Sequence, residues 1–112
     1  MRQNPFAQLL GDLLELAPTL QGVILYEESG DEIALAPESL RETLLELAAV
    51  NRGVAQRGER CYLLGEQSAS YGHPIKLDGV SYLLLLLGEP QGEAELARIA
   101  EAAASSLEIL LR

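Results

Sequence analysis

Apolar residues recur every three or four positions near both ends of the chain, and this spacing predicts two amphipathic helices. In the first segment, Asn4 suits the N-cap, Pro5 suits the first helical position, and Pro18 ends the pattern after Ala17. Its apolar stripe consists of Phe6, Leu9, Leu10, Leu13, Leu14 and Ala17. The last segment, residues 93–111, has a stripe of Leu96, Ile99, Ala100, Ala103, Leu107, Leu110 and Leu111.

A third helical pattern, over residues 38–57, is apolar on more than one side. Its main stripe consists of Leu40, Leu44, Leu47, Ala48, Val54 and Ala55. Leu45 and Val50 stand outside that stripe. Because a single core covers only one face of a helix, these two residues predict a second contact.

Five shorter segments have the composition of β-strands. Residues 23–26 and 32–35 flank a cluster of turn-forming residues and predict a hairpin. Residues 60–65, about 71–77 and 80–87 predict a meander, in which Asp78 and Gly79 form a two-residue type I′ turn. Residues 83–87 are all leucine, so this strand needs cover on both faces and belongs in the middle of the sheet.

The resulting order, α-β-β-α-β-β-β-α, predicts an α/β (α+β) fold. We expect a single five-stranded antiparallel sheet in the spatial order 2-1-5-4-3, with helices on both faces. The chain has 112 residues, of which 48% are hydrophobic, enough for one core without disulfides or metals. Residues 1–112 are therefore expected to form a single domain.

Charge and targeting signals narrow the choice of partners. The chain has 8 Lys and Arg against 17 Asp and Glu, a formal net charge of −9, which disfavours nucleic acid and anionic lipid as partners. Its strongest apolar run, residues 82–87, is far too short to cross a bilayer, and no signal peptide is predicted. The only cysteine, Cys61, precludes an internal disulfide and suits a reducing compartment. We expect a cytoplasmic protein.

The residues that carry chemistry do not assemble a catalytic site from sequence alone. The only histidine, His73, fits a surface or turn position better than a pH-sensitive or catalytic one, and Cys61 fits a small buried position better than a reactive thiol. Residues 68–74 fit a connection between strands, with a ligand pocket as the alternative. No metal-ligand or phosphate-binding motif is present, so we expect no enzyme and no cofactor.

The chain from Leu9 to Leu110 resembles the Roadblock/LC7 family. The likeness lies in residues 20–25 and the following turn, in the long helix over residues 40–57, and in the hairpin at residues 77–79 before a very apolar strand. The resemblance implies a homo- or heterodimer. Bacterial members of the MglB type regulate small Ras-like GTPases, and others are subunits of dynein or of lysosomal scaffolds.

Two other function classes stay open beside a GTPase regulator. Residues 52–59 and 95–107 also bear some likeness to GAF domains, which bind small ligands, so a small-ligand sensor is the first alternative. A purely structural subunit of a larger assembly is the second.

The predicted interfaces follow from the apolar edge strand and the second helix. We expect a homodimer in which the third strands pair and the second helices cross over them. Its interface would contain Leu45, Val50, Arg60, Cys61, Tyr62 and Leu63. The outer side of the paired helices would bind the GTPase through Leu45, Glu46, Ala49, Arg52 and Gln56, with Arg52 bonding an acidic switch segment.

Overall fold

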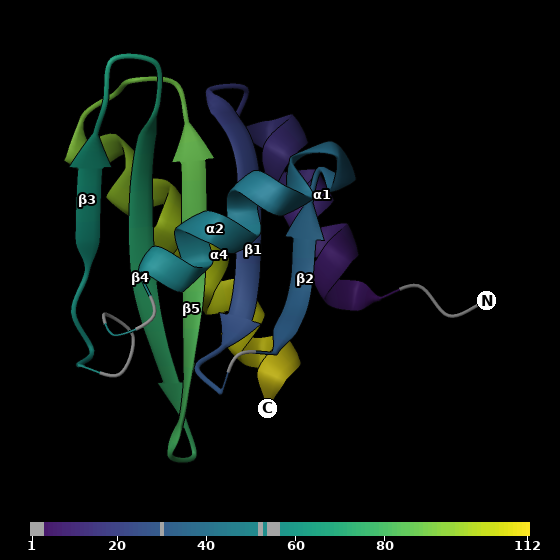
Figure 1. Ribbon diagram of the computed structural model, residues 1–112. Coiled ribbons are helices and arrows are strands. Elements are labelled where there is room, and N and C mark those ends of the chain that lie inside the picture. The colour runs from purple at the N-terminus through teal and green to yellow at the C-terminus, as the bar shows by residue number, and fades with distance from the viewer. Residues whose placement is uncertain (1–3, 30, 52, 54–56) are drawn as a thin grey trace.

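The protein is described by a computed structural model, which covers residues 4–29, 31–51, 53 and 57–112 (Figure 1). The helices are α1 (Pro5–Leu16), α2 (Arg41–Val50) and α4 (Glu93–Leu111), and a 3-10 turn, η1 (Glu38–Leu40), precedes α2. The strands are β1 (Leu20–Glu27), β2 (Glu32–Ala36), β3 (Cys61–Leu64), β4 (Ala69–Leu77) and β5 (Val80–Gly88). They form one five-stranded antiparallel sheet in the order β2-β1-β5-β4-β3, which confirms the predicted fold and strand order.

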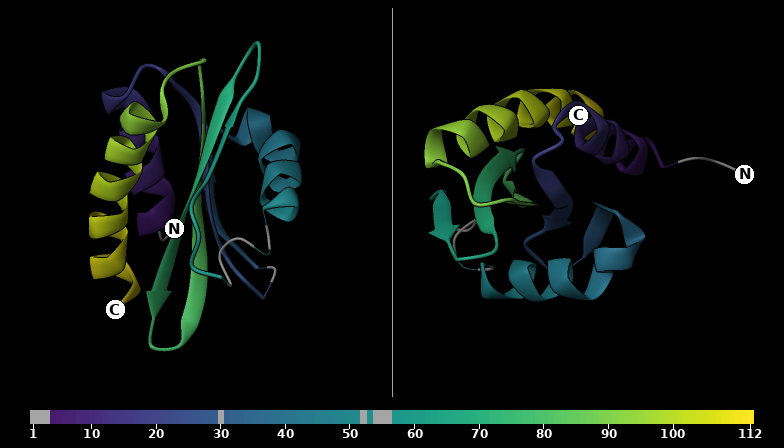
Figure 2. Two further views of the ribbon diagram at one scale, coloured as in Figure 1. Left: turned by 90° about the vertical axis from the view of Figure 1, so that its left-hand side faces the viewer. Right: turned by 90° about the horizontal axis from the view of Figure 1, so that it is seen from above.

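The helices lie in two layers, one on each face of the sheet. Figure 2 shows α1 and α4 side by side on one face and α2 on the other. At the start of α1, the Asn4 side chain accepts hydrogen bonds from the backbone N–H groups of Phe6 (2.9 Å) and Ala7 (3.4 Å), as the sequence predicts. These bonds satisfy amide groups that have no partner within the helix.

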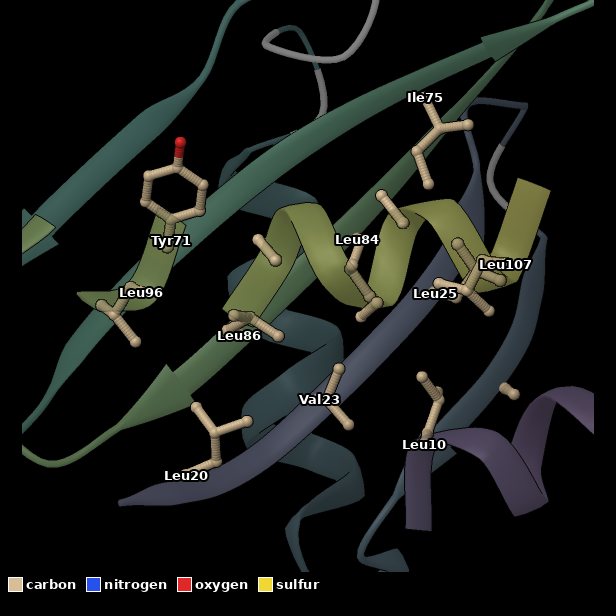
Figure 3. Close-up of a cluster of buried hydrophobic side chains, with 14 of the residues drawn as sticks. Leu10, Leu20, Val23, Leu25, Tyr71, Ile75, Leu84, Leu86, Leu96 and Leu107 are labelled. Atoms are coloured by element: carbon tan, nitrogen blue, oxygen red, sulfur yellow. The ribbon is translucent and has the colours of Figure 1, made fainter. Parts of the chain in front are cut away.

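The leucine run of β5 lies at the centre of two hydrophobic clusters, one on each face of the sheet. Leu84 and Leu86 face the α1 and α4 layer, where they join a cluster that includes Val23, Leu25 and Leu107 (Figure 3). The remaining leucines of the run, Leu83, Leu85 and Leu87, face α2 and pack in a second cluster. Both faces of this strand are therefore buried, which explains why its sequence does not alternate.

The second helix is shorter than the sequence predicts. The predicted helix over residues 38–57 begins as η1, and α2 ends at Val50. Asn51 follows with only 2% of its surface exposed, and its side-chain amide donates to the Leu47 carbonyl at 2.8 Å. The prediction of one uninterrupted helix was therefore wrong, because the helix is broken at Asn51, where the side chain shares an acceptor with the backbone. Val54 and Ala55 lie outside the described residues.

Two strands begin earlier than predicted because their first residues pair with neighbours. Leu20 of β1 and Ala69 of β4 both pair with Gly88 of β5. The hairpin between β4 and β5 has φ angles of 52° at Asp78 and 79° at Gly79, as a type I′ turn requires. Most of residues 68–74 therefore belong to β4, and the expectation of a connecting segment there was wrong.

Gly88 provides a test of this packing. A Cβ atom added there would lie 2.8 Å from the Thr19 carbonyl oxygen and 2.9 Å from Gln91 Nε2. We expect Gly88→Ala to lower the free energy of unfolding by about 1–3 kcal/mol, because backbone must move to admit the methyl group. Thermal or denaturant unfolding measures this change.

Gly11 is the matched control, because a Cβ added at this position of α1 meets nothing within 4 Å. Gly11→Ala should raise the free energy of unfolding by about 0.5–1 kcal/mol through its helix propensity. Equal effects of the two substitutions would contradict the packing described for Gly88.

Candidate functional site

The two edges of the sheet differ in how well they are closed. At the β2 edge, the Asn4 side-chain amide donates to the Ile33 carbonyl at 3.1 Å, and Arg41 bridges Glu32 and Glu38. The hydrogen bonds from Arg41 lower the pKa of Glu38, and they tie β2 to the start of α2. At the other edge, β3 pairs only with β4 among the described strands. Among the described strands, β3 therefore has the outer edge that other segments engage less, and such an edge can pair with another chain.

Apolar side chains accompany this open edge. Leu63 is 49% exposed and Leu64 is 61% exposed. Beside them lies a hollow of about 240 Å³, lined by Leu47, Leu63, Leu64, Gly65, Ser68, Ser70 and Leu87. Of these residues, only Leu63 was predicted from the sequence to lie in an interface. Leu47 was missed because it was assigned to the core stripe of the helix, and Leu87 because it was assigned to a strand buried on both faces. The hollow forms where this helix and this strand meet.

The outer face of α2 carries the second part of the site. Leu45 is 39% exposed and Val50 is 76% exposed, so the prediction that both stand outside the core is confirmed. Glu46 and Ala49 are exposed beside them. The other predicted partner-binding residues, Arg52 and Gln56, lie outside the described residues.

The inner face of the same helix fixes its position on the sheet. Leu44 and Ala48 are buried against β1 and β5. The buried Tyr26 hydroxyl on β1 donates to the Ala48 carbonyl at 2.7 Å. These contacts hold the outer face of α2 toward solvent.

The predicted residues at the β3 edge divide between the two faces of the sheet. Tyr62 packs with the cluster under α4, and its hydroxyl donates to the Gln91 carbonyl at 2.6 Å. Since side chains alternate along a strand, Cys61 and Leu63 face the α2 side. Cys61 is only partly buried, so the expectation of a buried cysteine was wrong.

Arg60, just before β3, reaches the α4 side. Its Nη1 atom lies 2.8 Å from Glu101 Oε1 and 3.4 Å from the Tyr71 hydroxyl. Hydrogen bonds to these groups raise the pKa of Arg60. Arg60 thus connects the open edge to α4, and in the described structure it has intramolecular partners.

His73 lies in the middle of β4 and is partly buried, not at a turn or on the open surface as expected. Its Nδ1 atom is buried and has no hydrogen-bond partner in the described structure. Burial lowers the pKa of His73, and the nearby Arg60 lowers it further. The residues next to His73 in the sequence do not indicate these surroundings, because Glu101 and Glu108 of α4 come from far along the chain.

Other chemistry is limited in the part of the chain that the structure describes. No group of three or more His, Cys, Asp or Glu side chains there is arranged to hold a metal ion. None of the described helices combines the length and the apolarity needed to cross a membrane. The described features that suit contact with another protein are the open edge, the hollow beside it and the outer face of α2.

Solved structures with a similar fold cover nearly the whole chain. Myxococcus xanthus MglB aligns with a TM-score of 0.71 at 15% sequence identity, over 99% of this chain and 92% of that protein. A Roadblock/LC7 domain from Streptomyces avermitilis aligns with a TM-score of 0.70 at 16% identity, over 93% of this chain and 99% of that domain. The gliding protein MglB from Thermus thermophilus aligns with a TM-score of 0.55 at 21% identity, over 94% and 92% of the two chains.

These similarities show that the chain has the Roadblock/LC7 fold. No protein-family model matches the sequence, and no curated protein matches it either.

A pair of neighbouring leucines tests the two faces of α2. Leu44→Ala should lower the free energy of unfolding by about 2–5 kcal/mol, because it leaves a cavity in the core. Leu45→Ala should change it by less than about 0.5 kcal/mol when unfolding is measured at low protein concentration. A large loss of stability with Leu45→Ala would show that this side chain belongs to the protomer core.

Proposed function

We propose that this chain, with its Roadblock/LC7 fold, is a non-catalytic dimeric regulatory domain that binds a small Ras-like GTPase and modulates its nucleotide cycle. The observation that carries the proposal is the open, apolar β3 edge beside an exposed apolar face of α2. The fold shared with MglB and Roadblock/LC7 domains supports the choice of partner.

The dimer would form by antiparallel pairing of β3 with β3 of a second copy. Pairing would satisfy the backbone groups along the open edge and join the two sheets across a two-fold axis. The hollow beside Leu47 and Leu63 has the size and lining to take apolar side chains of the second copy. The β2 edge is less suited to this contact, because Asn4 and Arg41 already engage it.

The outer face of α2 would bind the GTPase. Leu45 and Val50 supply exposed apolar surface, and Ala49 between them allows close approach. Glu42 and Glu46 are exposed one turn apart, and neither forms an ion pair with another described residue. This part of the helix favours a partner surface with basic groups, in contrast to the acidic segment expected opposite Arg52.

The small-ligand alternative is less well supported. The hollow at β3 measures about 240 Å³, below the roughly 300–1,000 Å³ typical of ligand pockets, and it opens at the sheet edge. A second hollow, of about 330 Å³, reaches that range, but Val80 is the one apolar side chain among its lining residues, which are Glu27, Glu28, Ser29, Gly79, Val80 and Ser81. A structural subunit would use the same dimer without the GTPase, so the binding experiment below separates these two functions.

Leu63→Lys tests the dimer. A lysine at this exposed edge position would place like charges close together in the paired strands, and edge lysines oppose strand pairing. We expect the wild-type chain to sediment as a dimer at micromolar concentration and the variant as a folded monomer.

Leu16→Lys is the matched control, since Leu16 is 83% exposed but lies on α1, away from β3. This variant should remain a dimer. A wild-type monomer at high micromolar concentration, or a Leu63→Lys dimer of unchanged affinity, would contradict the proposed interface.

Leu45→Asp tests the GTPase contact. Replacing an exposed apolar residue of α2 with a charge should weaken binding by roughly tenfold or more, about 1.4 kcal/mol, if Leu45 lies near the centre of the contact. Calorimetric titration would use small Ras-like GTPases of the host, loaded with GDP or with a GTP analogue, and Leu16→Asp as the control.

Absence of binding by the wild-type chain to either nucleotide form would overturn the GTPase function. If the dimer nevertheless forms, the structural subunit becomes the better description. Equal binding by wild type and Leu45→Asp would place the contact elsewhere on the molecule.

A further inference from the structure

We propose that His73 is a proton-sensitive latch: in mild acid it takes up a proton and breaks the Arg60–Glu101 bridge that ties the start of β3 to α4. The consequence for association rests on the proposed function, because that function pairs β3 with a second copy. The latch itself is a property of the protomer.

The sheet register places the members of the latch together. Cys61 pairs with Gly72 and Tyr62 with Tyr71, so the same register puts Arg60 opposite His73. Tyr71 and Ile75, two positions on either side of His73, belong to the cluster under α4. Because side chains alternate along β4, His73 faces the same layer.

Arg60 connects the start of β3 both to α4 and to β4. Arg60 Nη1 lies 2.8 Å from Glu101 Oε1 on α4, and the same nitrogen lies 3.4 Å from the Tyr71 hydroxyl on β4. Arg60 and Glu101 are each about half exposed, with 48% and 55% of their side-chain surface accessible. Ion pairs of this exposure contribute little free energy, so a modest local change is enough to break this one.

The neutral imidazole fits this environment and the protonated one does not. Nδ1 is buried with no hydrogen-bond partner in the described structure, whereas an imidazolium needs an acceptor at each nitrogen. The charged groups that act on His73 are Arg60 at the start of β3 and Glu101 and Glu108 on α4. Tyr71 lies two positions before His73 on the same face of β4, and its phenol accepts a hydrogen bond from Arg60 at 3.4 Å.

A proton taken from solvent therefore changes which cation Glu101 binds. Protonated His73 repels Arg60 and attracts Glu101 and Glu108, so it competes with Arg60 for the Glu101 carboxylate. Once Arg60 is displaced, the residue before β3 loses its connection to α4. The edge strand that pairs in the proposed dimer is then less well ordered.

The pH range follows from the direction of the pKa change. Burial lowers the pKa of His73, so the intact latch favours the neutral form. The latch is fully stable above the ordinary histidine pKa of about 6.5, and it weakens as the pH falls below that value. Carboxylates titrate mainly near pH 4, and His73 is the only histidine of the chain, so the change between about pH 7 and 5 reports mainly on this residue.

The first test is an NMR titration of the imidazole in the full chain, where the single histidine needs no assignment. We expect a pKa below 6.5, which rises in Arg60→Gln and falls in Glu101→Gln. Arg98→Gln is the matched control on α4, because Arg98 pairs with Glu95 instead. In the wild type, the amide signals of Cys61–Leu64 should shift along the same titration curve.

The second test is dimer affinity, measured by sedimentation at pH 7.5 and 5.5. We expect the wild-type dissociation constant to rise by about threefold or more at the lower pH, because protonation of His73 loosens the edge strand in both copies. It should stay constant in His73→Gln, which cannot be protonated.

The outcomes separate the latch from the proposed function. Either of two results would overturn the latch: a His73 pKa near 6.5 that does not change in Arg60→Gln, or β3 amide signals that do not follow the His73 titration curve. Neither result depends on whether His73→Gln folds. A wild-type monomer at both pH values would overturn the dimer, and the titration would still decide the latch. A dimer whose affinity is the same at both pH values would overturn the coupling between them.

Discussion

The burial of both faces of β5 is the constraint on which the rest of this structure depends. A strand of five consecutive leucines has no solvent-facing side, so layers must form above and below it and other strands must flank it. β1, the next most apolar strand, and β4 take those flanking positions. The less apolar β2 and the short β3 are left at the edges, where half-buried strands are tolerated.

The two helical layers cover the sheet unequally, and this difference creates the candidate site. The layer of α1 and α4 reaches from β2 to β4 and encloses the larger core cluster. Opposite it, α2 has 10 residues, about 15 Å of helix, and packs mainly on β1 and β5. Among the described residues, such a helix leaves the β3 side of this face of the sheet uncovered, which is where Leu63 and the hollow lie. The exposed apolar surface follows from the length of α2 as much as from the residues on it.

Sequence patterns predicted the features that depend on neighbouring residues. The Asn4 cap, the Asp78–Gly79 turn and the buried β5 run are local signals, and from them the fold class and strand order could be inferred. The end of α2 was missed because it depends on the Asn51 side chain, which is buried only once the helix lies on the sheet. His73 was misplaced for a similar reason, since its surroundings come from α4 and from Arg60.

The distribution of charge gives the two edges different properties. The chain has 8 Lys and Arg against 17 Asp and Glu, so cations are scarce. One of them, Arg41, ties β2 to the start of α2, and another, Arg60, ties the start of β3 to α4. At β2 the Arg41 bridges and the Asn4 side chain engage the edge strand itself. At β3 the Arg60–Glu101 bridge lies just before the strand. It therefore connects the start of β3 to α4 and leaves the backbone edge of the strand open. An edge strand that is anchored at its start but not covered is suited to pairing with another chain. In the proposed dimer, a loss of the Arg60–Glu101 bridge would therefore act at the start of the pairing strand.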